Sequence, residues 1–143
     1  MSDKVFVDSN VLIYAHDVDA AGKHQIARDV IEDLWSSRLG VLSTQVLQEF
    51  YVNVTRKIPT PLERWQARAV VAAYAAWQVE SIGPNEILAA SELEEHNQLA
   101  FWDALIVTSA ITGGASRVLT EDLNAGQRIG GVLIEDPFRL PAS

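Results

Sequence analysis

KVFVDSN (residues 4–10) places a short, mostly apolar run directly before three polar residues. A brief apolar run that ends at polar residues is typical of a strand buried on both faces. Asp8 would then lie at the carboxyl end of this first strand, with Ser9 and Asn10 behind it. Two interpretations stay open for Asp8: it caps a following helix, or it is a metal ligand at a strand end.

Apolar runs alternate with helical patterns through the rest of the chain. Further strands are expected at 40–42, 80–82, 117–119 and 132–134, and helices at about 23–37, 44–57, 61–78, 84–97 and 101–112. Strands that alternate with helices imply a parallel α/β sandwich. The length suits a single domain over residues 1–143. The carboxyl ends of parallel strands share one rim, where ligands bind, so Asp8, Glu121 and Asp122 are expected close together.

Composition excludes several classes of site and location. There is no cysteine, which removes disulfides, zinc–thiolate sites and thiol nucleophiles, and the three histidines form no close pair. A net charge of −8 argues against a protein that coats DNA but leaves room for a basic partner. No apolar run is long enough to cross a membrane, and the first residues do not resemble a secretory signal. We therefore expect no membrane association and a cytoplasmic location.

Asp103 stands in a helical segment, 99–107, that is apolar almost all the way round. Such a helix should be buried, and a buried carboxylate without a partner is costly. A cation, a basic side chain or several donors must offset that cost. An ion pair with Arg117 is one possibility; a metal ligand is the interpretation that we favour.

Two further groups of acids are ambiguous by themselves. Glu49 belongs to a polar stripe with Gln45, Asn53 and Arg56 at helical spacing, which alone indicates a solvated face. Thr120, Glu121 and Asp122 follow the strand at 117–119, where a turn with a capping aspartate is the plain alternative. Of the two acids in that turn, we favour Asp122 as the one that reaches the site.

Four segments in order, residues 5–14, 47–51, 102–107 and 119–123, resemble the PIN-domain family, specifically the VapC-type toxin ribonucleases. The resemblance implies a three-layer α/β/α sandwich with a central, mainly parallel sheet. It implies Mg²⁺ or Mn²⁺ held by Asp8, Glu49, Asp103 and Asp122, with Ser9 or Asn10, Thr120 and the neighbouring Glu121 in support. The tail at 134–138 departs from the family ending, because Asp136 stands where Asn is usual.

The same resemblance implies a metal-dependent endoribonuclease that hydrolyses RNA phosphodiester bonds. It also implies a toxin that acts as a homodimer and is inhibited by a cognate antitoxin protein. Independently of any family, carboxylates without cysteine or paired histidine suit hard cations such as Mg²⁺. Whether one metal or two would bind is left open.

Two alternatives stand beside this interpretation. An aspartyl phosphatase of the haloacid-dehalogenase type needs a second Asp where Asn10 stands and a late lysine, yet no lysine follows Lys57. A PIN-like module that binds RNA or protein without catalysis is the stronger alternative, although all four acids are present. The basic residues Arg56, Lys57, Arg64 and Arg68 suggest an RNA contact only weakly, because an ordinary solvated surface explains them as well.

Overall fold

The computed structural model describes residues 3–139 and consists of a sheet with helices on both sides. The strands are β1 (Val5–Val7), β2 (Gly40–Ser43), β3 (Gln78–Glu80), β4 (Arg117–Leu119), β5 (Arg128–Ile129) and β6 (Val132–Glu135). The helices are α1 (Ser9–His16), α2 (Gly22–Ser37), α3 (Thr44–Arg56), α4 (Arg64–Tyr74), α5 (Pro84–Asn97) and α6 (Phe101–Thr112).

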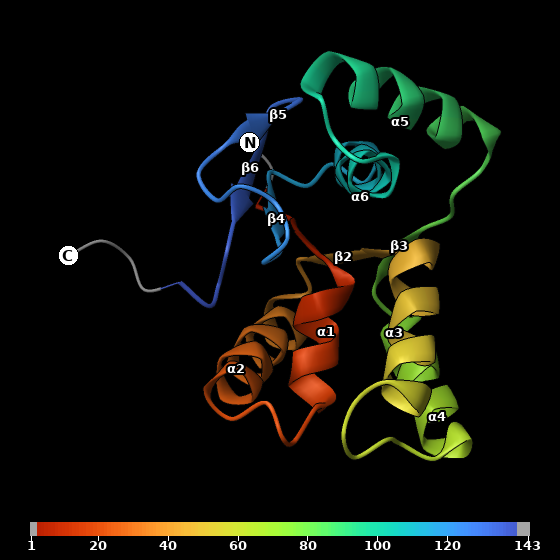
Figure 1. Cartoon of the computed structure of the whole chain (residues 1–143), viewed down its shortest axis with the longest axis vertical. Coiled ribbons are helices and arrows are strands. Elements are labelled where there is room, and N and C mark those ends of the chain that lie inside the picture. The colour runs from red at the N-terminus through yellow and green to blue at the C-terminus, as the bar shows by residue number, and fades with distance from the viewer. Residues whose placement is uncertain (1–2, 140–143) are drawn as a thin grey trace.

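The strand order β3-β2-β1-β4-β6-β5 explains how the helices are distributed. All strand pairs are parallel except β5 with β6. The chain first moves from β1 outward to β2 and β3, and then returns to β4 on the other side of β1. Because parallel crossovers are right-handed, the reversal puts α1–α4 on one face and α5 and α6 on the other, as Figure 1 shows. The expected α/β fold with a mainly parallel sheet is confirmed.

The reversal of direction between β1 and β4 creates the crevice in which such folds bind ligands. Val7 pairs with Leu119 in the parallel register, and the amide of Asp8 donates to the carbonyl of Leu119 at 3.0 Å. The residues that follow these two strands, Asp8 and Thr120, therefore leave the sheet side by side.

Burial of the two central elements holds this crevice in place. Strand β1 is buried along its whole length, and α6 is buried from Ala104 to Ala110. Phe6 of β1, Leu12 of α1 and Phe50 of α3 are among the largest side chains that are fully buried. These contacts anchor β1, α1 and α3 in one core, so the polar residues at their ends are fixed relative to one another. Within the part of the chain that the structure describes, no helix has the length and apolarity to cross a membrane.

Several expected boundaries are wrong. Helix α4 begins at Arg64 rather than near Pro61, because Glu63 and Gln66 form a reciprocal capping box, and it ends at Tyr74. Strand β3 consequently runs over 78–80 instead of 80–82. The short antiparallel strand β5 was not expected, since its two residues carry no pattern of their own.

Candidate active site

Asp8 performs two tasks at the end of β1. Its Oδ1 accepts a 2.7 Å hydrogen bond from the amide of Ser9 and so caps α1, while its Oδ2 accepts one of 2.8 Å from the hydroxyl of Thr120. The residue is only 5% exposed. Burial raises the pKa of Asp8 to about 6 in spite of these two donors, and the charges of Glu49 and Asp122 add to the increase. Asp8 therefore caps α1, and its carboxyl group is at the same time buried among other acids.

Two neutral side chains, Ser9 and Gln45, hold the carboxylate of Glu49 near Asp8. The Ser9 hydroxyl donates to Glu49 Oε2 at 2.8 Å, and Gln45 Nε2 donates to Oε1 at 2.8 Å. Gln45 is buried and Glu49 is partly buried. The interpretation of their stripe as a solvated face is therefore wrong for these two residues, because α3 turns this part of it toward the end of β1.

Asn10 ties the turn after β4 to the start of α1. Its Nδ2 donates to Asp122 Oδ2 at 3.0 Å and to the Thr120 hydroxyl at 3.2 Å. The Thr120 hydroxyl also accepts from the Asp122 amide at 3.1 Å. Two neutral side chains, Asn10 at the start of α1 and Thr120 after β4, therefore hold Asp122 near Asp8.

Glu121 is occupied elsewhere. Its carboxylate accepts a 2.8 Å bond from Lys23 Nζ and a 2.5 Å bond from the Tyr14 hydroxyl. Burial alone would raise the pKa of Glu121, but these two donors hold it below its usual range. Glu121 is therefore paired with a cation, whereas Asp122 is the acid of this turn whose charge reaches Asp8 and Asp103.

Asp103 lies in the first turn of α6, one residue before the buried stretch of that helix begins. It is only partly buried, which corrects the expectation of a fully buried carboxylate. Burial first, and then the charges of Asp122 and Glu49, raise its pKa. The alternative of an ion pair with Arg117 is wrong, because Arg117 pairs with Glu135 at 3.0 Å on the surface.

Acids from four separate elements therefore gather at one rim: Asp8, Glu49, Asp103 and Asp122. Their charges repel one another, and none of the ion pairs between described residues includes any of them. The donors that they do receive are hydroxyl, amide and backbone groups, which leave the negative charge in place.

The chemical type of this donor set fits a hard divalent cation, which prefers carboxylate oxygens. The spacing fits less closely. Among residues 3–139, no three His, Cys, Asp or Glu side chains stand close enough to hold one ion as they are. Asp8, Glu49 and Asp122 are each turned toward neutral donors, so their side chains would have to rotate to converge on a metal.

Sequence reasoning missed three residues of this region. Lys23 forms an ion pair with Glu121, and Tyr14 donates a hydrogen bond to it, both from positions distant in the sequence; Gln45 was noted only as a member of the polar stripe. No local pattern links Lys23 with a carboxylate 98 residues away. Gln45 had a signal, since it stands one helical turn before Glu49.

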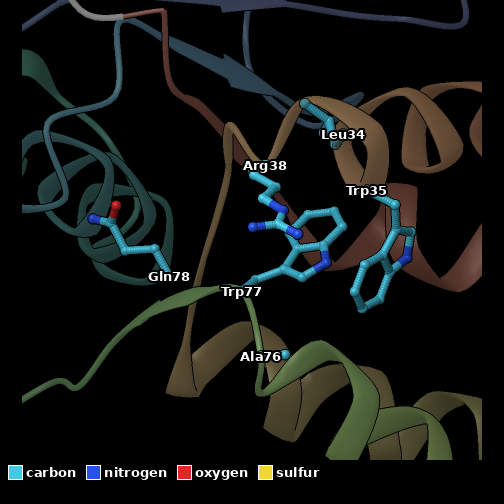
Figure 2. A pocket seen from close by; sticks show the side chains of 7 residues that line it. Leu34, Trp35, Arg38, Ala76, Trp77 and Gln78 are labelled. Carbon is cyan, nitrogen blue, oxygen red and sulfur yellow. The ribbon is translucent and has the colours of Figure 1, made fainter.

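A separate cavity of about 350 Å³ lies at the amino ends of β2 and β3. Figure 2 shows the aromatic side chains of its lining, Trp35 and Trp77, together with Arg38. Because the strands are parallel, the amino ends of β2 and β3 lie at the opposite end of the sheet from the acids, which follow the carboxyl ends of β1 and β4. The cavity is therefore not part of the candidate active site.

Comparison with known proteins places the fold in a family. No curated protein matches the chain. Among solved structures, a toxin–antitoxin complex from Klebsiella pneumoniae is similar with a TM-score of 0.71 and 17% identity, over 96% of this chain and 100% of that one. The DNA-bound VapBC of Salmonella typhimurium is similar with a TM-score of 0.66 and 19% identity, over 94% and 98%. VapC20 of Mycobacterium tuberculosis, described as a Sarcin-Ricin loop cleaving toxin, is similar with a TM-score of 0.60 and 21% identity, over 80% and 87%.

At these identities the structures show a shared fold. The family itself is shown by sequence, because the model of the PIN domain matches residues 5–128, which is most of the chain. The chain therefore belongs to the PIN domain family.

Proposed function

We propose that this protein is a Mg²⁺- or Mn²⁺-dependent endoribonuclease that hydrolyses RNA phosphodiester bonds. The observation that carries the proposal is the rim of four acids, drawn from β1, α3, α6 and the turn after β4, that receives only neutral donors among the described residues. A structural ion network would be expected to pair such charges with Lys or Arg. Here the charges stay unpaired and the pKa values of Asp8 and Asp103 are raised.

In the proposed site, Asp8 and Asp103 would hold a metal directly, and Glu49 and Asp122 would hold a second one or contact the first through water. A bound divalent cation supplies activation of the attacking water and stabilisation of charge on the phosphate. The chain's own neutral residues orient the ligands: Thr120 fixes Asp8, and Asn10 fixes Asp122. These contacts limit the rotations that the acids can make, which is how second-layer groups tune metal sites.

We further propose that the protein is the toxin of a type II toxin–antitoxin pair, working as a homodimer in the cytoplasm. Support comes from structures with the same fold, which include a toxin–antitoxin complex, a DNA-bound VapBC and a Sarcin-Ricin loop cleaving toxin. A net charge of −8 is compatible with a basic antitoxin segment at the acidic rim.

The nuclease proposal is tested with purified protein and RNA whose cleavage site has been mapped. Cleavage should stop with EDTA, return with Mg²⁺ or Mn²⁺, and leave 5′-phosphate and 3′-hydroxyl ends in mass spectrometry. A single 2′-deoxy substitution at the cut should leave cleavage intact, because an external water rather than the 2′-hydroxyl attacks. Cyclic phosphate ends, or cleavage that persists in EDTA, would refute the carboxylate–metal mechanism. RNA binding without any cleavage would favour the non-catalytic module.

The toxin proposal is tested separately in cells. Expression of the wild-type chain alone should slow growth of the host, and Asp8→Ala should relieve the effect at equal protein level. If wild-type expression is harmless while the purified protein cleaves RNA, the nuclease proposal stands and the toxin proposal fails.

A further inference from the structure

Trp102 is a large aromatic side chain left in solvent at the edge of the acidic rim. It is 65% exposed and directly precedes Asp103 in the first turn of α6. Together with Gln45, Gln48 and Glu49 of α3, it lines a cavity of about 470 Å³. One wall of this cavity is therefore an indole ring, and another carries an acid of the rim.

Gln45 holds the two walls together. Its Nε2 donates to Glu49 Oε1 at 2.8 Å and to the backbone carbonyl of Trp102 at 3.4 Å, so it joins α3 to the start of α6. Gln45 is only 6% exposed, and its Oε1 has no hydrogen-bond donor among the described residues. Buried acceptors are nearly always satisfied in native structures. Since Gln45 lines the cavity, an N–H donor of a ligand bound there is one group that would satisfy this acceptor.

The chemistry of this cavity suits a nucleobase. A base offers a flat face that stacks on indole and carries N–H groups that an amide oxygen can accept. An apolar peptide side chain would gain from Trp102 but would leave the Gln45 oxygen without a hydrogen-bond donor. We propose that Trp102 is the stacking platform for the base beside the scissile phosphate of a single-stranded RNA, with Gln45 at its edge. This inference rests on the proposed nuclease function and assigns Trp102 as the residue that binds the base of the nucleotide.

The chain offers a matched control for Trp102. Trp65 is 64% exposed and occupies the second position of α4, just as Trp102 occupies the second position of α6. Trp102→Ala should raise KM for a mapped RNA substrate by about 5-fold to 100-fold with kcat unchanged, since stacking holds ground state and transition state alike. Trp102→Phe should recover part of this loss, Trp102→Leu little of it, and Trp65→Ala should match the wild type.

A thermodynamic cycle identifies the base. Substrates that carry an abasic ribose on either side of the cut are compared with intact RNA, each with wild-type protein and with Trp102→Ala. At one of the two positions, removal of the base and removal of the indole should each weaken binding, and the combined change should cost no more than either alone. Full additivity at both positions would overturn the inference while leaving the nuclease proposal untouched.

A binding assay under conditions that prevent cleavage distinguishes failure of the base site from failure of the nuclease proposal. With Ca²⁺ in place of Mg²⁺, fluorescence anisotropy of a labelled 12-nucleotide single-stranded RNA of random sequence should show about tenfold weaker affinity for Trp102→Ala. If wild-type protein does not cleave but shows this difference, the nuclease proposal fails and the base site stands. Equal affinities, or a change of oligomeric state in Trp102→Ala by sedimentation, would overturn the base site; the latter would assign Trp102 to an interface between copies.

Discussion

The Ser9 hydroxyl donates a 2.8 Å hydrogen bond to Oε2 of Glu49, and this bond joins the first residue of α1 to the middle of α3. The amide of the same Ser9 donates to Asp8 at 2.7 Å. One small residue therefore positions two acids that belong to different elements. Rotation of the Glu49 side chain toward a cation would have to break the hydrogen bond from Ser9.

Ser9→Ala should weaken metal binding without unfolding the protein. Loss of a group that orients a metal ligand typically costs 10- to 100-fold in affinity or activity, so the Mg²⁺ concentration for half-maximal cleavage should rise about 10-fold. Ser91→Ala, on the exposed surface of α5, is the control. An unchanged Mg²⁺ requirement would mean that the Ser9–Glu49 bond has no part in the site.

Asp103→Asn should lower RNA cleavage by about 1,000-fold or more while the fold is kept. Repulsion from Asp122 and Glu49 is removed, whereas a favourable charge near the start of α6 is lost, so the free energy of unfolding should change by no more than about 1 kcal/mol. Mg²⁺ should raise the wild-type melting temperature, as a ligand of the native state does, and should raise that of the variant much less. Glu95→Gln, an exposed acid of α5, should behave as wild type in both assays. Normal cleavage by Asp103→Asn would remove Asp103 from the site.

Asp122→Asn and Glu121→Gln decide which acid of the turn acts. The charge of Asp122 reaches Asp8 and Asp103, whereas Glu121 is paired with Lys23. Asp122→Asn should therefore reduce cleavage at least tenfold. Glu121→Gln should keep cleavage within about twofold and cost about 1 kcal/mol or less of stability, as expected for an exposed ion pair. The reverse pattern in cleavage assays would exchange the two assignments.

His16 predicts an acid-sensitive component of stability. Burial, and then the charges of His24 and Arg28, lower its pKa from 6.5 to about 4. The unfolded chain then binds more protons than the folded one between these values. Stability should fall as the pH drops from 6.5 to 4, by roughly 3 kcal/mol at most, and His16 should add no further loss below pH 4.

His16→Gln isolates this contribution from the other titrating groups. The variant loses the ring packing against Phe50 and Tyr74 and should be less stable than wild type at pH 7. Urea denaturation at pH 7, 5.5 and 4 should show this gap narrowing as the pH falls. A gap of constant size across the three pH values would contradict a buried, neutral His16.

Local signals explain which parts of the fold could be predicted from the sequence. Helices α5 and α6 begin and end where expected, because Pro84 suits a first helical turn and Gly113 ends α6. Strand β4 and the position of Asp8 at the end of β1 were also expected. Each of these features depends on residues that are neighbours in the sequence.

Long-range contacts explain what could not be predicted. Lys23 pairs with Glu121, so this acid does not belong to the acidic rim. No sequence pattern near either residue indicates the pairing. The burial of Gln45 depends on α6 approaching α3, which a helical stripe alone cannot show. The gathering of Glu49 with Asp8 was inferred from family resemblance, since its own pattern indicated a solvated face.

The position of β4 beside β1 also has a consequence for the protein during its own synthesis. A chain that has emerged from the ribosome only through α5 already contains Asp8 and Glu49, yet one long edge of β1 has no partner. Asp103 and Asp122 are still to come, and so is Thr120, which orients Asp8. The acid rim can therefore form only after nearly the whole sequence has left the exit tunnel. The proposed nuclease would therefore be inactive while its own chain is being translated, and its acidic rim would be complete only after release from the ribosome.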